Sequence, residues 1–151
     1  GMGNKVGQIT NRVTNMIEMF EQSVFNSDIG DWNTGRVRDM SYMFCSSKFN
    51  QHIGKWNVGN VRNMYCMFDT SPFNQPIGSW DVGNILDMSG MFKLSKFNRD
   101  ISMWNIVNVA YLGGMFRGSR FNQNLDRWKK IRPELGEDIP DYVPINKWIE
   151  Y

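Results

Sequence analysis

Few side chains in this sequence could carry acid–base or nucleophilic chemistry. His52 is the only histidine, and it occupies a slot that varies between otherwise similar segments. No motif places a nucleophile beside a base, which covalent catalysis requires. We therefore expect His52 to be a surface residue, and we expect no catalytic residue and no enzyme activity.

Metal chemistry is also poorly supported. Cys45 and Cys66 are the only cysteines, and no further ligand is spaced to complete a zinc site with them. The acids Asp28, Asp31 and Asp39 do not follow a calcium-loop pattern. We expect no metal and no cofactor, and we favour two free thiols over a disulfide.

The residues that do recur with strict spacing are apolar and amide residues, each repeating every 24 positions. The tryptophans are Trp32, Trp56, Trp80, Trp104 and Trp128. The Phe-Asn pairs begin at Phe25, Phe49, Phe73, Phe97 and Phe121. Two methionine series are Met16, Met40, Met64, Met88 and Met19, Met43, Met67, Met91, Met115. A serine closes each unit at Ser23, Ser47, Ser71, Ser95 and Ser119.

A period of 24 indicates stacked repeats, because a unit this short cannot bury its own apolar face. Leucine-rich repeats run about 20–29 residues, whereas a propeller blade needs about 40. The sequence therefore predicts an α/β repeat, namely a right-handed leucine-rich-repeat-like solenoid of about five 24-residue coils. This domain would span residues 1–128, with a partial first unit.

Each coil is predicted to hold a short parallel strand and a short helix. In the unit from residue 73, a strand is expected over Ile77–Trp80, where Gly78 allows a bend. A helix is expected over Ile85–Phe92, because its apolar residues fall at i, i+3, i+6 and i+7. Asn84 then occupies the N-cap position.

The repeated tryptophans and methionines are assigned to the core, since they align with phenylalanines and valines. The alternatives are a glycan-stacking platform for the tryptophans and a binding stripe for the methionines. The repeated asparagines and serines are expected to satisfy turn and backbone groups between coils.

The stretch FNQPIGSWDVGNILDMSGMF, residues 73–92, carries a family resemblance. It resembles the repeat of BspA-type leucine-rich-repeat surface proteins, in the variant of unknown function found in many mollicute surface lipoproteins. The resemblance covers about residues 10–128 and departs at Ser102, Val107 and Leu112. It implies an extracellular or cell-surface location, a role in adhesion or protein binding, and no catalytic residues.

The last segment, residues 129–151, departs from the repeat and is predicted to cap the final coil. The alternative is a peptide-like docking tail. The apolar residues that could form the cap are Ile131, Leu135, Ile139, Tyr142, Val143, Trp148 and Ile149.

Function should reside in the outward positions that vary between units. Met103 and Tyr111 interrupt otherwise polar columns, in which Asp31 and Lys55, or Asp39, Asn63 and Asp87, occupy the equivalent positions. An apolar residue in a solvent-facing column indicates a contact patch. The candidate partner-binding residues are Met103, Tyr111, Tyr42, Lys55 and Asp31.

Four arginines form a second candidate site. Arg12 and Arg36 share one column, and Arg38 and Arg62 share its near neighbour, where the predicted helices would begin. Helix N-termini attract anions, so a sulfate or acidic-glycan site is one interpretation and a solvated face is the other.

Composition narrows the partner classes. The net charge of +2 over 151 residues does not indicate nucleic-acid binding. No apolar run is long enough to span a bilayer, so membrane attachment would need an anchor outside this sequence. No signal peptide is visible, although Gly1-Met2 resembles the remnant of a cleaved tag.

We therefore expect a non-catalytic repeat scaffold for protein–protein interaction or adhesion at the cell surface. One alternative is a surface module that binds glycans or anions. Another is a purely architectural segment of a longer surface array.

Overall fold

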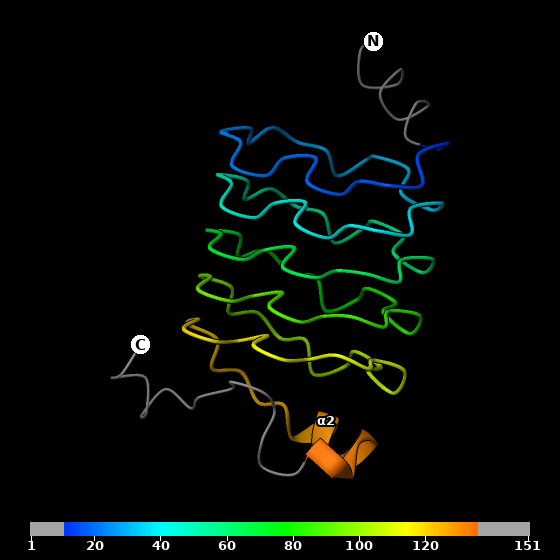
Figure 1. Cartoon of the computed structure of the whole chain (residues 1–151), viewed down its shortest axis with the longest axis vertical. Coiled ribbons are helices and arrows are strands. Elements are labelled where there is room, and N and C mark those ends of the chain that lie inside the picture. The colour runs from blue at the N-terminus through cyan, green and yellow to red at the C-terminus, as the bar shows by residue number, and fades with distance from the viewer. Residues whose placement is uncertain (1–10, 136–151) are drawn as a thin grey trace.

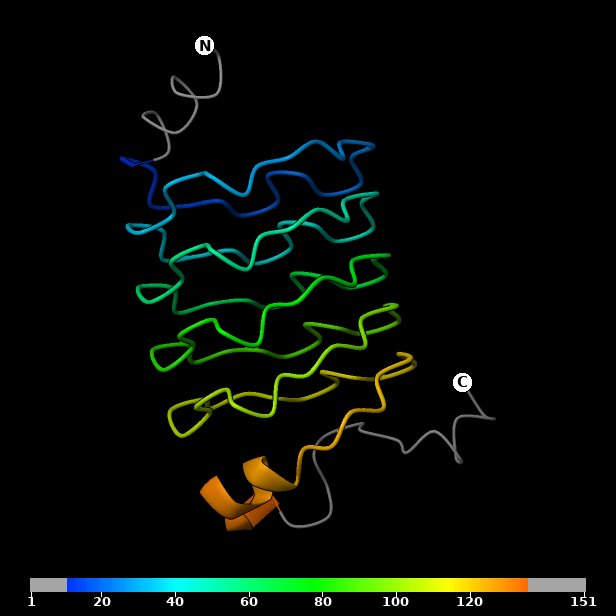
Figure 2. The same cartoon turned by 180° about the vertical axis from the view of Figure 1, so that it is seen from behind.

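The computed structural model describes residues 11–135. In this range the chain winds through coils that stack along one axis, each coil repeating the path of the one before (Figures 1 and 2). Isolated parallel β-bridges connect equivalent residues of successive coils, 24 positions apart. The bridged residues are Asn15, Asp39, Asn63, Asp87 and Tyr111.

The predicted fold class is wrong, because the coils contain neither the expected strand nor the expected helix. Among residues 11–135, the helices are α2 (Asp126–Ile131) and the 3-10 helix η1 (Pro133–Leu135), and both follow the last coil. The bridges are single and do not extend into a sheet. The protein is therefore not an α/β leucine-rich-repeat-like solenoid.

Consecutive turns replace the predicted helix over Ile85–Phe92. The amides of Met91, Lys93 and Ser95 each donate to the carbonyl three residues earlier, at 3.1–3.2 Å. The alternating amides of Met88, Gly90 and Phe92 donate to carbonyls of the next coil at 2.9 Å. An α-helix would instead direct every amide to the carbonyl four residues earlier. The spacing of three between Ile85, Met88 and Met91 therefore comes from consecutive turns and not from a helix.

Left-handed backbone positions keep these turns from becoming helical or extended. Two positions per coil adopt a positive φ, for example Tyr42 at 56° and Ser46 at 55°. In the coil of residues 73–96 the same positions are Gly90 at 63° and Leu94 at 54°. A helix or a strand needs successive residues with negative φ. A residue with positive φ interrupts such a series, so neither element can extend through these positions.

The predicted strand over Ile77–Trp80 is also a turn, closed by the Trp80 amide and the Ile77 carbonyl at 3.1 Å. Gly78 is needed here because the next coil passes very close. A Cβ atom at Gly78 would lie 2.5 Å from the carbonyl oxygen of Asp100. Asn84 does not cap a helix, since its Nδ2 donates to the Gly59 carbonyl of the preceding coil at 2.7 Å.

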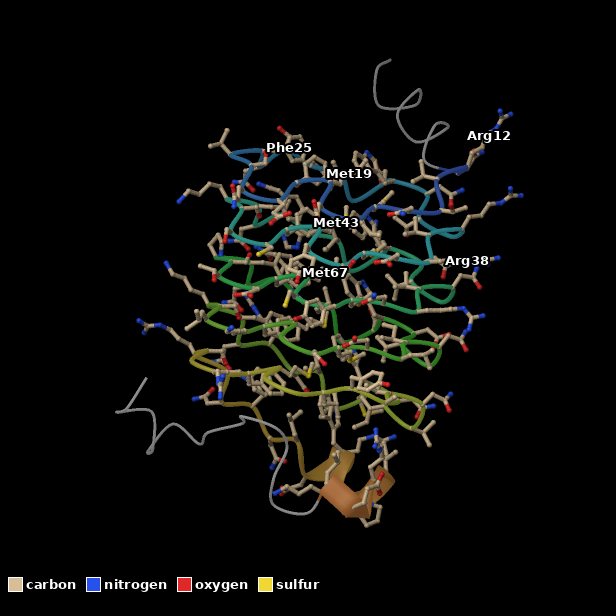
Figure 3. All side chains as sticks on the ribbon, viewed as in Figure 1. Arg12, Met19, Phe25, Arg38, Met43 and Met67 are labelled. Carbon is tan, nitrogen blue, oxygen red and sulfur yellow. The ribbon has the colours of Figure 1, made fainter. Side chains whose placement is uncertain are left out.

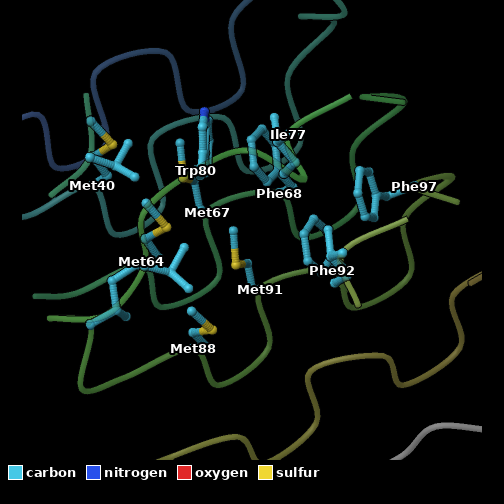
Figure 4. Close-up of a cluster of buried hydrophobic side chains, with 14 of the residues drawn as sticks. Met40, Met64, Met67, Phe68, Ile77, Trp80, Met88, Met91, Phe92 and Phe97 are labelled. Atoms are coloured by element: carbon cyan, nitrogen blue, oxygen red, sulfur yellow. The ribbon is translucent and has the colours of Figure 1, made fainter. Parts of the chain in front are cut away.

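The repeated apolar residues form the core, as predicted. Trp56, Trp80, Trp104 and Trp128 are at most 4% exposed, and the rings of Trp80 and Trp104 stack at 6.4 Å. Each of these indoles also donates from Nε1 to a carbonyl of the preceding coil at 2.9–3.1 Å. The methionines and the phenylalanines form neighbouring columns of the same core (Figure 4). Fully burying one phenylalanine side chain contributes about 1.5–3 kcal/mol of transfer free energy.

The first members of the apolar series are more exposed to solvent than the later ones. Met19 is 45% exposed, so its assignment to the core is wrong, whereas Met43, Met67, Met91 and Met115 are fully buried. Trp32 and Phe25 are half-buried. Both lie in the first described coils, where the described residues provide no earlier layer.

The repeated asparagines and serines have the predicted structural roles. Asn50 Oδ1 accepts from the Asn74 amide at 2.9 Å, and the same bond recurs along the series to Asn122. Ser71 Oγ accepts from the amide of Phe73, two residues later, at 3.1 Å. These bonds satisfy polar groups that the stacking of the coils removes from water.

The chain leaves the repeat at α2. Trp128, inside α2, is fully buried and stacks on Trp104, and Leu135 packs against the core. The Arg132 guanidinium donates from Nη1 to the carbonyls of Val109 and Ile106 in the last coil. The other predicted cap residues from Ile139 to Ile149 lie outside the described residues, so the division at residue 128 stays a prediction.

Candidate functional site

Each coil has two long runs joined by two turns. In the coil of residues 97–120 we call residues 97–104 the first run, 105–108 the edge turn, 109–116 the second run and 117–120 the far turn. Equivalent residues in the other coils keep these names. The buried Trp104 of the first run and the buried Leu112 of the second run belong to one core cluster, so the core lies between the runs.

The predicted partner-binding residues do not form a single surface. Asp31, Lys55 and Met103 are exposed on the first run, where Met103 is 64% exposed. Tyr111 is 63% exposed on the second run. Tyr42 is half-buried on the second run, against Tyr65. The core therefore separates Met103 from Tyr111.

The polar column that Tyr111 interrupts has a structural explanation. Oδ1 of Asp39, Asn63 and Asp87 each accepts from the amide two residues later at 2.8 Å, which closes an Asx turn. Tyrosine cannot make this bond, and its ring projects outward instead. Tyr111 thus lacks the side-chain bond that closes the turn at the other positions of this column.

Sequence reasoning missed Leu86, which lies directly beside Tyr111. The Tyr111 amide donates to the Leu86 carbonyl at 3.1 Å, and Leu86 is 45% exposed. Its column contains Arg38 and Arg62 in earlier coils, so the change to leucine could have identified it. Leu86 and Tyr111 form an exposed apolar pair on the second run.

A shallow hollow of 300 Å³ lies on the same run, beginning two residues after Tyr111. It exists because one of the left-handed positions loses its side chain along the stack, from Tyr42 through Cys66 to Gly90 and Gly114. The residues that line the hollow are Tyr65, Cys66, Ser89, Gly90, Lys93, Gly113, Gly114 and Arg117.

The hollow is positively charged. Lys93 and Arg117 occupy one column and no carboxylate is among the lining residues, although Asp69 lies one coil away from Lys93 in that column. Burial and the charge of Asp69 raise the pKa of the Cys66 thiol to about 11. Cys66 is therefore neutral near pH 7, and a neutral thiol is a weak nucleophile.

Both cysteines are free thiols in the structure, as favoured from the sequence. Burial also raises the pKa of Cys45. Burial, together with a hydrogen bond to Tyr65, raises the pKa of Tyr42 to about 12.

The anion site was predicted from helix N-termini, which the structure does not place there. The four arginines nevertheless lie near one another. No helix begins near Arg12, Arg36, Arg38 or Arg62, because the helices among residues 11–135 lie after residue 125. All four side chains are exposed at or beside the edge turn. Arg12 and Arg36 line a second hollow of 420 Å³, together with Asn11, Asn33 and Gly35.

The described residues offer neither a metal-binding cluster nor a membrane-spanning helix. Within residues 11–135 no three His, Cys, Asp or Glu side chains gather closely enough to hold a metal ion. Neither described helix has the length and apolar character needed to cross a bilayer.

Comparison with known proteins gives a family but no individual relative. No curated protein and no solved structure matches the chain. One family model matches twice, over residues 6–93 and 69–134, and so covers most of the sequence. The chain therefore belongs to the family described as "Mycoplasma protein of unknown function, DUF285".

Proposed function

We propose that the protein is a non-catalytic scaffold that binds a protein partner at the cell surface. The observation that carries this proposal is the contrast between the inside and the outside of the coils. Most buried positions repeat the same or a similar residue from coil to coil, whereas several exposed columns vary, for example Asp31, Lys55, Ser79 and Met103. A rigid stack with variable outward residues suits recognition of a partner.

The partner surface that we propose consists of Leu86 and Tyr111 on the second run and of Lys93 and Arg117 where the far turn begins. Leu86 and Tyr111 offer an exposed apolar pair, and tyrosine and arginine are enriched where binding energy concentrates. Lys93 and Arg117 line the adjoining hollow and would attract an acidic side chain of the partner. The surface therefore suits a protein segment that carries both apolar and acidic residues.

The proposed location rests on resemblance. The repeat is similar to that of BspA-type surface proteins, and the matching family is a Mycoplasma family. We propose an extracellular or cell-surface location on this basis, with any membrane anchor outside the present sequence.

Binding of the fluorescently labelled protein to cultured epithelial cells tests this function. We expect binding that is lost when the cells are first treated with trypsin and retained when their glycans are removed enzymatically. The double variant Leu86→Ser/Tyr111→Ser should weaken binding at least about tenfold, since truncated interface anchors typically cost 1–2 kcal/mol each.

The matched control is Met103→Ser/Val107→Ser, which removes two exposed apolar side chains from the first run and the edge turn. It should change binding less than threefold. Equal losses in both variants would refute the partner surface. Trypsin-resistant binding would point to a glycan, and a wild-type protein that binds no cells would favour the architectural alternative.

A further inference from the structure

Four arginines gather along one edge of the stack. Arg12 and Arg36 belong to the edge turns of successive coils, and Arg38 and Arg62 begin the adjacent second runs. Arg12 and Arg38 project from the same side of the molecule in Figure 3. We call these four residues the arginine edge.

Within residues 11–135 no carboxylate forms an ion pair with the arginine edge. The ion pairs among residues 11–135 join Lys129 to Asp126 and Arg132 to Glu134, at the other end of the stack. The nearest acid in sequence, Asp39, uses Oδ1 to accept from the amide and hydroxyl of Ser41 at 2.7–2.8 Å. The four guanidinium groups are exposed and unpaired within the described chain.

The stacking brings like charges close together. The Arg62 amide donates to the Arg38 carbonyl at 2.8 Å, so the two residues occupy adjacent coils in one column. Bridged backbones of this kind lie about 4.8 Å apart, and like charges at such neighbouring positions destabilise a fold. An anionic ligand would relieve this repulsion.

The arginine edge also has a shape that can receive a ligand. Its hollow of 420 Å³ is lined by Arg12 and Arg36 and by the side chains of Asn11 and Asn33. Guanidinium groups bind sulfate and carboxylate through two parallel hydrogen bonds. The amide side chain of Asn11 can donate a further hydrogen bond to a hydroxyl group beside those anions.

The repeat favours a polymer over a single ion, because each column offers a cation in successive coils. A single-stranded nucleic acid is a poorer match, since its binding sites interleave cations with aromatic stacking platforms. Among residues 11–135 the only exposed aromatic is Tyr111, which lies in a later coil than any of the four arginines.

We infer that the arginine edge is a binding site for an acidic polysaccharide, whose sulfate or carboxylate groups pair with arginines of successive coils. The arginine edge adjoins the partner surface at one point, where the Leu86 amide donates to the Arg62 carbonyl at 2.8 Å. The two sites share no residue, and neither proposal depends on the other.

Heparin binding tests the inference. In calorimetry at low salt we expect the wild type to bind heparin, and the variant Arg12→Gln/Arg36→Gln/Arg38→Gln/Arg62→Gln to bind at least about tenfold more weakly. Each exposed ion pair contributes little alone, but the loss of four together supports a change of this size. The matched control removes four exposed cations elsewhere, with the changes Lys48→Gln, Lys96→Gln, Arg120→Gln and Arg127→Gln.

A second readout separates ligand binding from a change in folding. Heparin should raise the melting temperature of the wild type and of the control, but not that of the arginine variant, since a ligand stabilises the state that binds it. Without heparin and at low salt, the arginine variant should be at least as stable as the wild type, because the repulsion is gone.

Three results would overturn the inference. The first is a wild type that does not bind heparin at 50 mM salt, a condition of the experiment at which electrostatic binding is strong (roughly a 14 Å screening length). The second is an equal loss in the control, which would mean that only net charge matters. The third is displacement of heparin by a single-stranded oligonucleotide at a lower concentration than by chondroitin sulfate, which would identify a nucleic-acid site.

Discussion

At the scale of single residues, the left-handed positions carry an unusual constraint. Leu94 has a φ of 54°, a conformation that costs a non-glycine residue about 1 kcal/mol or more. Its side chain fills the space above Gly118, where a Cβ atom would lie 2.5 Å from Leu94 Cδ2. The glycine in one coil therefore makes room for the leucine of the coil before it.

We predict that Leu94→Gly is more stable than Leu94→Ala by about 1 kcal/mol in urea unfolding, since alanine keeps the backbone strain and glycine removes it. The control position is Leu86, which is similarly exposed but has no positive φ. There alanine should be the more stable replacement. The same order at both positions would show that the left-handed conformation of Leu94 carries no measurable cost.

At the scale of elements, α2 ends the stack by a polar contact as well as an apolar one. Arg132 lies just after α2 and its guanidinium donates to two carbonyls of the last coil, while Nε contacts Glu134 Oε1 at 2.7 Å. The same guanidinium holds the pKa of Glu134 below its usual value. These bonds supply donors to carbonyls at the end of the stack.

We predict that Arg132→Gln lowers the free energy of unfolding by about 1.5–3 kcal/mol, the usual range for hydrogen bonds that involve a charged group. The exposed partner provides the control. Glu134→Gln removes only the surface ion pair and should change the free energy of unfolding far less than Arg132→Gln does, because solvent screens an exposed pair. Chemical denaturation followed by tryptophan fluorescence measures both, and equal effects would show that the carbonyl contacts of Arg132 do not stabilise the stack.

At the scale of the whole molecule, the coils stabilise one another through repeated neighbour contacts. Phenylalanine rings stack between coils along the whole series, with Phe68 and Phe92 at 5.8 Å and Phe92 and Phe116 at 5.9 Å. Each coil contacts mainly the one before and the one after, so stability should grow with the number of coils.

We predict that duplicating residues 73–96 in tandem raises the urea midpoint and increases the dependence of unfolding on urea by about a fifth, in proportion to the added surface. A tandem copy of residues 73–84 alone is the control. It shifts the repeat by half a coil and should destabilise the protein. A full-unit insertion that lowers the midpoint would contradict stability through neighbour contacts.

The sequence by itself determined the 24-residue period, the buried tryptophans and the roles of the repeated asparagines and serines. These follow from local chemistry, because a residue that recurs at the same spacing in every unit meets its own copy in the next coil. The aromatic series and the turn hydroxyls of Ser47 and Ser71 could therefore be assigned without coordinates.

The tertiary structure alone decided the backbone conformation and the grouping of the surface residues. A spacing of three between Ile85, Met88 and Met91 is compatible with a helix and with consecutive turns. Only the pairing of alternate amides with the next coil distinguishes the two. Likewise, Met103 and Tyr111 are close in sequence but separated by the core, whereas Leu86 meets Tyr111 because residues about 24 positions apart become neighbours when the coils stack.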